Sequence, residues 1–122
     1  MAIARKRHRE AIESLYEDTC TVITHDPVKV NGVTASYQDV TVYSIQPCRL
    51  SFGSSPATSQ TDGADEQTQT IELFIAPELT IPAGSRIDVT RQGKTVSYKS
   101  SGVPSVYPTH QEIELELFDR WA

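Results

Sequence analysis

The spacing of hydrophobic residues divides the chain into a short helical segment and a long region of strands. Between residues 4 and 16, apolar residues recur at helical intervals, which predicts an amphipathic helix over residues 2–17. From residue 19 onward, apolar and polar residues alternate, as in strands with one buried face. This period of two predicts a first group of strands over residues 19–50 and the remaining strands over 69–118.

Turn-forming residues separate the strands of the first group. Asn31-Gly32 predicts a tight hairpin turn, because both residue types adopt positive φ readily. Asp26-Pro27 is expected to break the strand before it. Apolar positions change parity over residues 40–45, ahead of Pro47, which indicates a β-bulge or an edge position.

The second group is more regular. Around Phe74 the inward positions are the residues on either side of it, so Phe74 is expected on the outward face. Gln92-Gly93 predicts a second hairpin turn. In the strand expected over residues 111–117, Ile113, Leu115 and Leu117 alternate with three glutamates, which places the three apolar residues on the inward face. The fold class expected is mainly β. A small antiparallel β-barrel of about six to seven strands, or a sandwich of the same strands, would carry one N-terminal α-helix.

Residues 53–68 have a different composition from the strands around them. Only two alanines among these sixteen residues are apolar, so the segment cannot bury a face of its own. Loops of this length are usually functional segments or linkers. Neither flanking part makes a domain alone, so we expect a long flexible loop inserted in a single domain spanning residues 1–122.

Length and composition fit one folded domain, with 122 residues, of which 38% are hydrophobic and 22% charged. No apolar run approaches ~18 residues, so no membrane-spanning helix and no membrane partner is expected. The N-terminus lacks the apolar stretch of a signal peptide. Cys20 and Cys48 lie in predicted strands and are expected to be reduced, buried thiols in a chain folded in the cytoplasm.

The net charge of −5 hides a strong asymmetry. Four of the 11 basic residues lie close together near the N-terminus: Arg5, Lys6, Arg7 and Arg9. Beyond residue 9 the chain has seven basic and sixteen acidic residues. Cations at a helix start oppose the helix dipole, so helix stability does not explain them, and a role in contacting a partner is favoured. The acidic remainder argues against coating nucleic acid.

Catalytic motifs are weak in this sequence. Gly93-Lys94-Thr95 resembles the end of a phosphate-binding loop, but Asp88 stands where its first glycine belongs. His110-Gln111-Glu112 has the spacing of a zinc deaminase motif without the cysteine pair that should follow. We therefore expect no enzyme, cofactor or metal. A nucleic-acid-binding barrel remains the alternative from a different class, although Phe74 is the one outward aromatic predicted on the strands and cations are few.

Several stretches, taken in order, resemble one known family. They are KRHREAIE (6–13), PCRLS (47–51), LFIAP (73–77), AGSRIDV (83–89), and SGVP with YPTHQE within 101–112. Together they are similar to the head-closure, or stopper, proteins of long-tailed phages and prophages of Gram-positive bacteria, which are also labelled head–tail connector or minor capsid proteins. A tail-completion or terminator protein is a related alternative.

The resemblance implies a small β-barrel with an added helix that forms a homo-oligomeric ring in the virion neck, assembled in the host cytoplasm. The ring would contact portal, adaptor and tail proteins, and double-stranded DNA would pass through it without sequence-specific contact. The channel loop would include Ser54, Ser55, Gln60, Asp62, Gly63, Asp65, Glu66 and Gln67. Partner docking is expected at Arg5, Lys6, Arg7, Arg9, Phe74 and Trp121.

Overall fold

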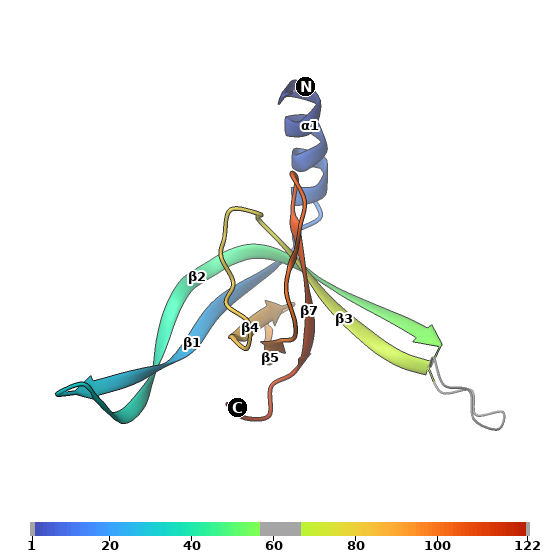
Figure 1. Cartoon of the computed structure of the whole chain (residues 1–122). Coiled ribbons are helices and arrows are strands. Elements are labelled where there is room, and N and C mark those ends of the chain that lie inside the picture. The colour runs from blue at the N-terminus through green and yellow to red at the C-terminus, as the bar shows by residue number, and fades with distance from the viewer. Residues whose placement is uncertain (1, 57–66, 122) are drawn as a thin grey trace.

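A short helix stands on a sheet of seven antiparallel strands (Figure 1). The computed structural model describes residues 2–56 and 67–121, although not the side chains of residues 2–5, 54–56 and 67–69. The elements are α1 (Ala2–Glu13), β1 (Asp18–Val30), β2 (Val33–Pro56), β3 (Gln67–Ile75), β4 (Arg86–Arg91), β5 (Lys94–Ser100), β6 (Ser105–Val106) and β7 (Gln111–Leu117).

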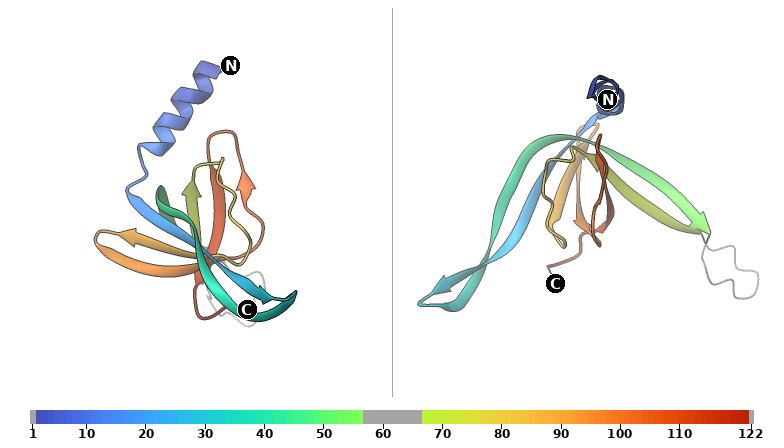
Figure 2. Two further views of the ribbon diagram at one scale, coloured as in Figure 1. Left: turned by 90° about the vertical axis from the view of Figure 1, so that its left-hand side faces the viewer. Right: turned by 45° about the horizontal axis from the view of Figure 1, so that its top comes forward.

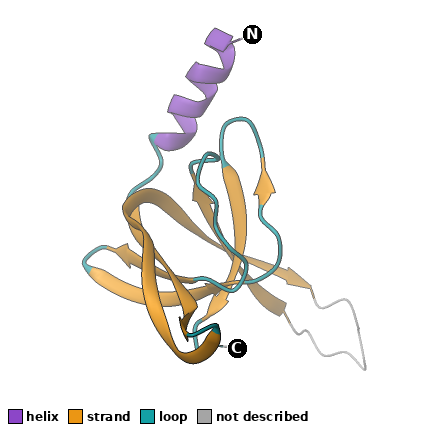
Figure 3. Cartoon of the chain, turned by 60° about the vertical axis from the view of Figure 1, so that its left-hand side comes forward, coloured by secondary structure: helices purple, strands orange, loops and turns teal. Residues whose placement is uncertain are grey.

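The sheet closes on itself. Its strand order is β3-β2-β1-β4-β5-β7-β6, and β3 also pairs with β7, so that six strands form a ring of hydrogen bonds with β6 attached to β7 (Figure 3). The expected barrel-like, mainly β fold is confirmed. Most inward positions of the alternating pattern fill the interior, with these residues buried: Cys20, Val22, Cys48, Leu50, Leu73, Ile75, Ile81, Ile87, Val89, Tyr98, Ile113 and Leu115. Leu117, which the same alternation places inward, is exposed at the end of β7.

Two long two-stranded ribbons leave the closed part of the sheet on opposite sides (Figures 1 and 2). One is the β1–β2 hairpin, in which β1 pairs with β4 only over Thr19–Ile23 and continues to Val30 paired with β2 alone. We call residues 24–30 and 33–40 the hairpin arm. The other ribbon is formed by the ends of β2 and β3, beyond the part of β3 that pairs with β7.

The expected strand break at Asp26-Pro27 is wrong. Pro27 pairs with Tyr37 inside the hairpin arm, where β1 has no strand on its other edge. A residue without an N–H is tolerated at such an edge because no second ladder needs it. The predicted turn is confirmed: Asn31 and Gly32 have φ of 52° and 80° and link the two strands.

The predicted boundaries of loop and helix also need correction. Residues 53–56 continue β2 and residues 67–68 belong to β3, with Gly53 paired to Thr70 and Pro56 to Gln67. Backbone hydrogen bonds hold this ribbon without needing apolar side chains. The helix ends at Glu13, not at residue 17. A tight turn follows, in which the Leu15 N–H donates to the Ile12 carbonyl.

The bulge expected near residues 40–45 is confirmed. The β1–β2 register shifts on both sides of Val22, and Ile45 adopts a φ of 49°. The two cysteines are buried and free, as expected. A hydrogen bond with Cys20 and burial raise the pKa of the Cys48 thiol far above its usual range. A thiol held protonated in this way is a weak nucleophile.

Candidate functional site

The basic first turns of α1 point away from the sheet. In Figures 1 and 3 the helix projects from one end of the molecule with its N-terminus outermost. Lys6 and Arg7 are exposed, and neither forms an ion pair within the described residues. The backbone of Arg5 belongs to the same helix, but its side chain is outside the described part. Lys6 and Arg7 are therefore accessible cations on an otherwise acidic chain.

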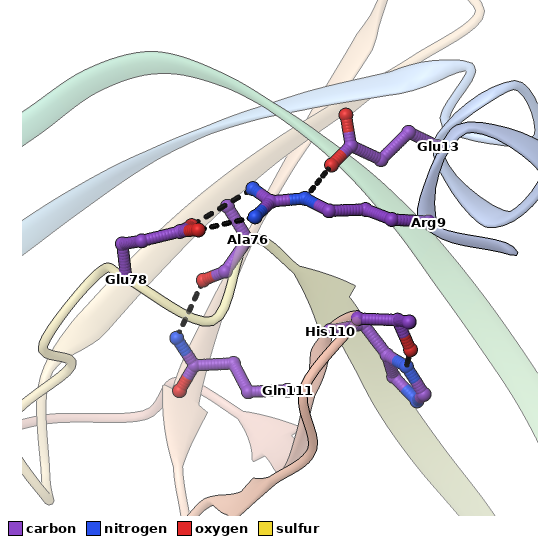
Figure 4. Close-up of polar contacts among 7 residues, drawn as sticks. Arg9, Glu13, Ala76, Glu78, His110 and Gln111 are labelled. Atoms are coloured by element: carbon purple, nitrogen blue, oxygen red, sulfur yellow. Dashed lines mark hydrogen bonds and ion pairs between the residues drawn. The ribbon is translucent and has the colours of Figure 1, made fainter. Parts of the chain in front are cut away.

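Arg9 differs from the other basic residues because its own chain binds it. Its guanidinium forms a two-pronged ion pair with Glu78, with Nη2 and Oε2 2.8 Å apart, and a further contact with Glu13 (Figure 4). These bonds raise the pKa of Arg9, and the bond from Arg9 lowers the pKa of the Glu78 carboxyl. Arg9, expected in partner docking, ties the helix to the segment between β3 and β4.

A buried glutamine anchors the segment that carries Glu78. The Gln111 amide nitrogen donates to the Ala76 carbonyl at 2.8 Å and to the Leu79 carbonyl at 2.6 Å (Figure 4 shows the first). The Thr80 N–H also donates to the Tyr43 hydroxyl at 3.0 Å. The connection between β3 and β4 is thus fixed to β7 and β2, and it presents Glu78 to the helix.

Breaking this tether should free the helix and leave the sheet unchanged. Arg9 and Glu78 are both substantially exposed, so Glu78→Gln is expected to change the free energy of unfolding by less than about 1 kcal/mol. Amide hydrogen exchange of residues 2–13 should become several-fold faster, while exchange in β7 stays the same. Glu10→Gln removes an exposed helix carboxylate with no such bond and is the control. Equal exchange in the two variants would contradict the tether.

The same contact predicts a dependence on pH. Because the folded-state pKa of Glu78 is lowered, the tether contributes its full stability above the ordinary glutamate pKa of about 4.3. Its contribution is lost as the pH falls through the lower folded-state value. In the wild type, the amide hydrogen exchange rate of the helix, corrected for intrinsic rates, should therefore increase relative to that of β7 below about pH 4. In Glu78→Gln the same rate should change much less with pH.

Phe74 lies on the outward face of β3, but it is only half exposed. The His110 ring covers part of it, with ring centroids 5.7 Å apart. The base of the helix borders the same place, where a cleft of about 150 Å³ is lined by Ile12, Leu15, Tyr16, Arg49, Phe74 and His110. Burial raises the pKa of Tyr16 to about 12.

The prediction that Phe74 is the one outward aromatic is wrong, since Tyr37, Phe52 and Tyr107 are exposed.

Trp121 packs onto its own chain. Its indole stacks on His25 of β1, with ring centroids 4.9 Å apart, and meets Phe118 edge-on. Tyr37 stacks on His25 as well, and His25 Nδ1 lies 3.0 Å from Asp39 Oδ1. The C-terminal segment therefore covers one face of the hairpin arm. Sequence reasoning missed this cluster because its members lie far apart along the chain.

The predicted channel residues are described only in part. The backbones of Ser54, Ser55 and Gln67 lie in the ribbon formed by β2 and β3. The others fall outside the described residues: Gln60, Asp62, Gly63, Asp65 and Glu66.

Over residues 2–56 and 67–121, no three His, Cys, Asp or Glu side chains gather in an arrangement able to hold a metal ion. Within these same ranges, α1 is neither long nor apolar enough to cross a membrane.

Comparison with known proteins identifies a similar fold. No protein-family model and no curated protein matches this sequence. The structure is similar to that of protein xkdH of the phage-like element PBSX from Bacillus subtilis, with a TM-score of 0.51 and 12% sequence identity. The match covers 81% of this chain and 91% of that one. The closed sheet described above is therefore a fold that this chain shares with a protein of a phage-like element.

Proposed function

We propose that this chain is a structural subunit of the head–tail connector of a long-tailed phage or prophage, in the head-closure position. The observation that carries the proposal is the shared fold with protein xkdH of the phage-like element PBSX. The ordered motifs that resemble head-closure proteins point in the same direction. Copies of the chain would form a ring in the virion neck, after folding and assembly in the cytoplasm of the bacterial host.

The distribution of charge supports a role in assembly. Lys6 and Arg7 are exposed in the N-terminal half of a projecting helix, where portal or adaptor proteins can reach them. Arg9 keeps that helix at a fixed place on the sheet through Glu78. The tail would dock on the opposite side of the ring. No part of this role requires a cofactor, a membrane or catalysis.

DNA retention is the second part of the proposal. In the sequence, the channel residues connect β2 to β3, and the paired ends of these two strands form a ribbon that extends away from the closed sheet (Figure 1). Its acidic residues Asp62, Asp65 and Glu66 would repel DNA phosphates, so that DNA can slide past the segment after it opens. Double-stranded DNA would accordingly be a passing partner without sequence-specific contacts.

A tail-terminator ring is the related alternative. The two roles differ in when the ring forms. A terminator is expected to form a stable ring free in solution, whereas a head-closure protein is expected to close its ring on the portal and adaptor. Sedimentation of the purified chain, alone and with filled, tailless heads, distinguishes them.

Reversing the charge of the helix tip tests the docking role. The variant Lys6→Glu with Arg7→Glu should fold normally, because both side chains are exposed and not ion-paired within the described structure. The yield of joined, tailed particles should fall at least tenfold, since like charges across an interface oppose association. Particles are counted by electron microscopy.

The matched control carries the same charge change elsewhere. Lys29→Glu with Arg120→Glu reverses two exposed cations that lie outside the helix. Its particle yield should stay within about twofold of the wild type, because neither side chain lies on the helix through which docking is proposed. Equal yields from the two double variants would refute docking through the helix tip.

A further inference from the structure

One face of the hairpin arm carries three valines, two of which are exposed at its tip. Cross-strand partners share a face, and Val30 pairs with Val33 beside the turn. These two valines are 56% and 69% exposed. We call this the valine face, and its members are Asp26, Val28, Val30, Val33, Ser36 and Gln38. Asp26 is the one charged residue on it. The opposite face is the one that Tyr37, His25 and Trp121 cover with their ring stack.

A groove with matching properties lies elsewhere on the same chain. It runs between the end of β2 and the β4–β5 hairpin and has a volume of about 270 Å³. Phe52 and Val96 in its wall are 47% and 41% exposed. Its lining residues are Leu50, Phe52, Val89, Arg91, Gln92, Lys94, Val96 and Tyr98. This lining is apolar with two cations and no carboxylate, the reverse of the charge on the valine face.

The two cations of the groove are placed unfavourably in the isolated chain. Arg91 and Lys94 are direct cross-strand partners beside the Gln92-Gly93 turn. Like charges directly opposite each other destabilise a strand pair. The Arg91 guanidinium carbon lies 5.8 Å from the centroid of the Phe52 ring. Its one ion pair among the described residues is long, with 4.0 Å between Arg91 Nε and Asp18 Oδ1. A carboxylate arriving from another molecule would relieve this repulsion.

We infer that the valine face of one copy docks in the groove of a second copy, a contact that rests on the proposed ring and specifies how its subunits meet. Asp26 then faces Lys94, Val28 lies beside Val96, and the Val30–Val33 pair lies near Tyr98. The spacing agrees, because Asp26 and Val30, like Lys94 and Tyr98, are four strand residues apart, or about 13 Å.

The shape of the molecule makes this contact intermolecular. The arm runs about 23 Å beyond the part of β1 that pairs with β4 (Figure 2). It extends away from the closed sheet, in which Phe52 of the groove is paired with Ile71, and Ile71 with Leu115. A chain with a projecting apolar face and a complementary groove in another place associates head to tail. Such contacts close into rings when the rotation between copies allows it.

Cross-linking between two variants that each carry one added cysteine tests the contact. Val28→Cys in one chain and Val96→Cys in another are mixed at ~1 mM, a concentration suited to weak contacts, and mildly oxidised. The native Cys20 and Cys48 are buried and do not compete. The mixed dimer, identified by mass spectrometry, should form at least tenfold faster than with Lys29→Cys in place of Val28→Cys, because Lys29 lies on the other face of the arm. Equal rates, or no mixed dimer in either mixture, would overturn the docking.

A charge exchange gives an independent result. Asp26→Lys in the first chain should slow cross-linking several-fold, and Lys94→Asp in the second should restore the rate. If neither substitution changes the rate, the assignment of Asp26 to Lys94 is wrong. In a separate experiment, the yield of assembled particles is compared with and without the wild-type chain, to which no cysteine has been added. If particle assembly requires this chain but the cross-link does not form, the docking is refuted and the proposed function still stands.

Discussion

Replacing Gln111 with leucine should lower the free energy of unfolding by about 2–4 kcal/mol. Gln111 is 1% exposed, and its amide nitrogen satisfies the carbonyls of both Ala76 and Leu79. Leucine has a similar volume but no donor, so both carbonyls lose this hydrogen bond. The Ala76 carbonyl keeps a long hydrogen bond from the Leu79 N–H at 3.4 Å, so the larger cost falls on the Leu79 carbonyl. A buried polar group left unsatisfied costs about 1–3 kcal/mol. The loss would also loosen the segment that presents Glu78, so exchange in the helix should increase with it.

Urea denaturation measures this effect, and Gln46 provides the matched control. The Gln46 amide donates to the Ser44 carbonyl at 3.1 Å, but the residue is only half-buried, so water can replace the bond. Gln46→Leu is therefore expected to change the free energy of unfolding by less than about 1 kcal/mol. Equal destabilisation by the two substitutions would show that Gln111 does not anchor the connection between β3 and β4.

Leu73→Ala should destabilise the chain by about 2–5 kcal/mol. Leu73 is fully buried and lies between Leu50 of β2 and Ile113 of β7, where β3 closes the ring of strands. Truncation removes apolar contacts on both sides and leaves a cavity that the closed sheet cannot fill by collapsing. For a domain of ordinary stability this is a large fraction of the total.

The control for Leu73→Ala is the same substitution at Leu117. That residue is in β7 as well, but its side chain is 66% exposed. Leu117→Ala is expected to change the free energy of unfolding by no more than about 0.5 kcal/mol. Thermal unfolding followed by circular dichroism separates the two outcomes. Similar melting temperatures for both variants would contradict the placement of Leu73 in the closing seam.

The buried face of each strand could be predicted from the sequence because alternation reports directly on which side of a strand is covered. Leu73 and Ile113 were correctly placed inside in this way. The turns at Asn31-Gly32 and Gln92-Gly93 were also predictable, since few residues adopt the positive φ that tight hairpins require. These signals are local, and they were enough to predict the fold class.

The strand boundaries were not predictable in the same way. Pro27 and residues 53–56 lie in two-stranded ribbons, where the backbone ladder supplies the hydrogen bonds and no buried side-chain pattern is needed. A composition that excludes a core does not exclude a paired ribbon. The sequence therefore predicted a broken strand and a longer loop where the structure has continuous strands.

The candidate site was predictable only where it depends on exposure. Lys6 and Arg7 are exposed, as a charged helix face suggests. Arg9 is different because Glu78, 69 residues away, reaches it once the sheet has closed. Trp121 likewise meets His25 only through the folded C-terminal segment. Contacts across such separations depend on topology, which a single sequence does not contain.

If this chain joins heads to tails, as we propose, its absence should be visible by electron microscopy of the particles made without it. The phage or prophage that encodes the chain is induced with its gene deleted, and again with the wild-type chain supplied separately. We expect unjoined heads and free tails in the first case and joined particles in the second, with the labelled chain located at the head–tail junction. Normal joined particles in the absence of the chain would contradict it.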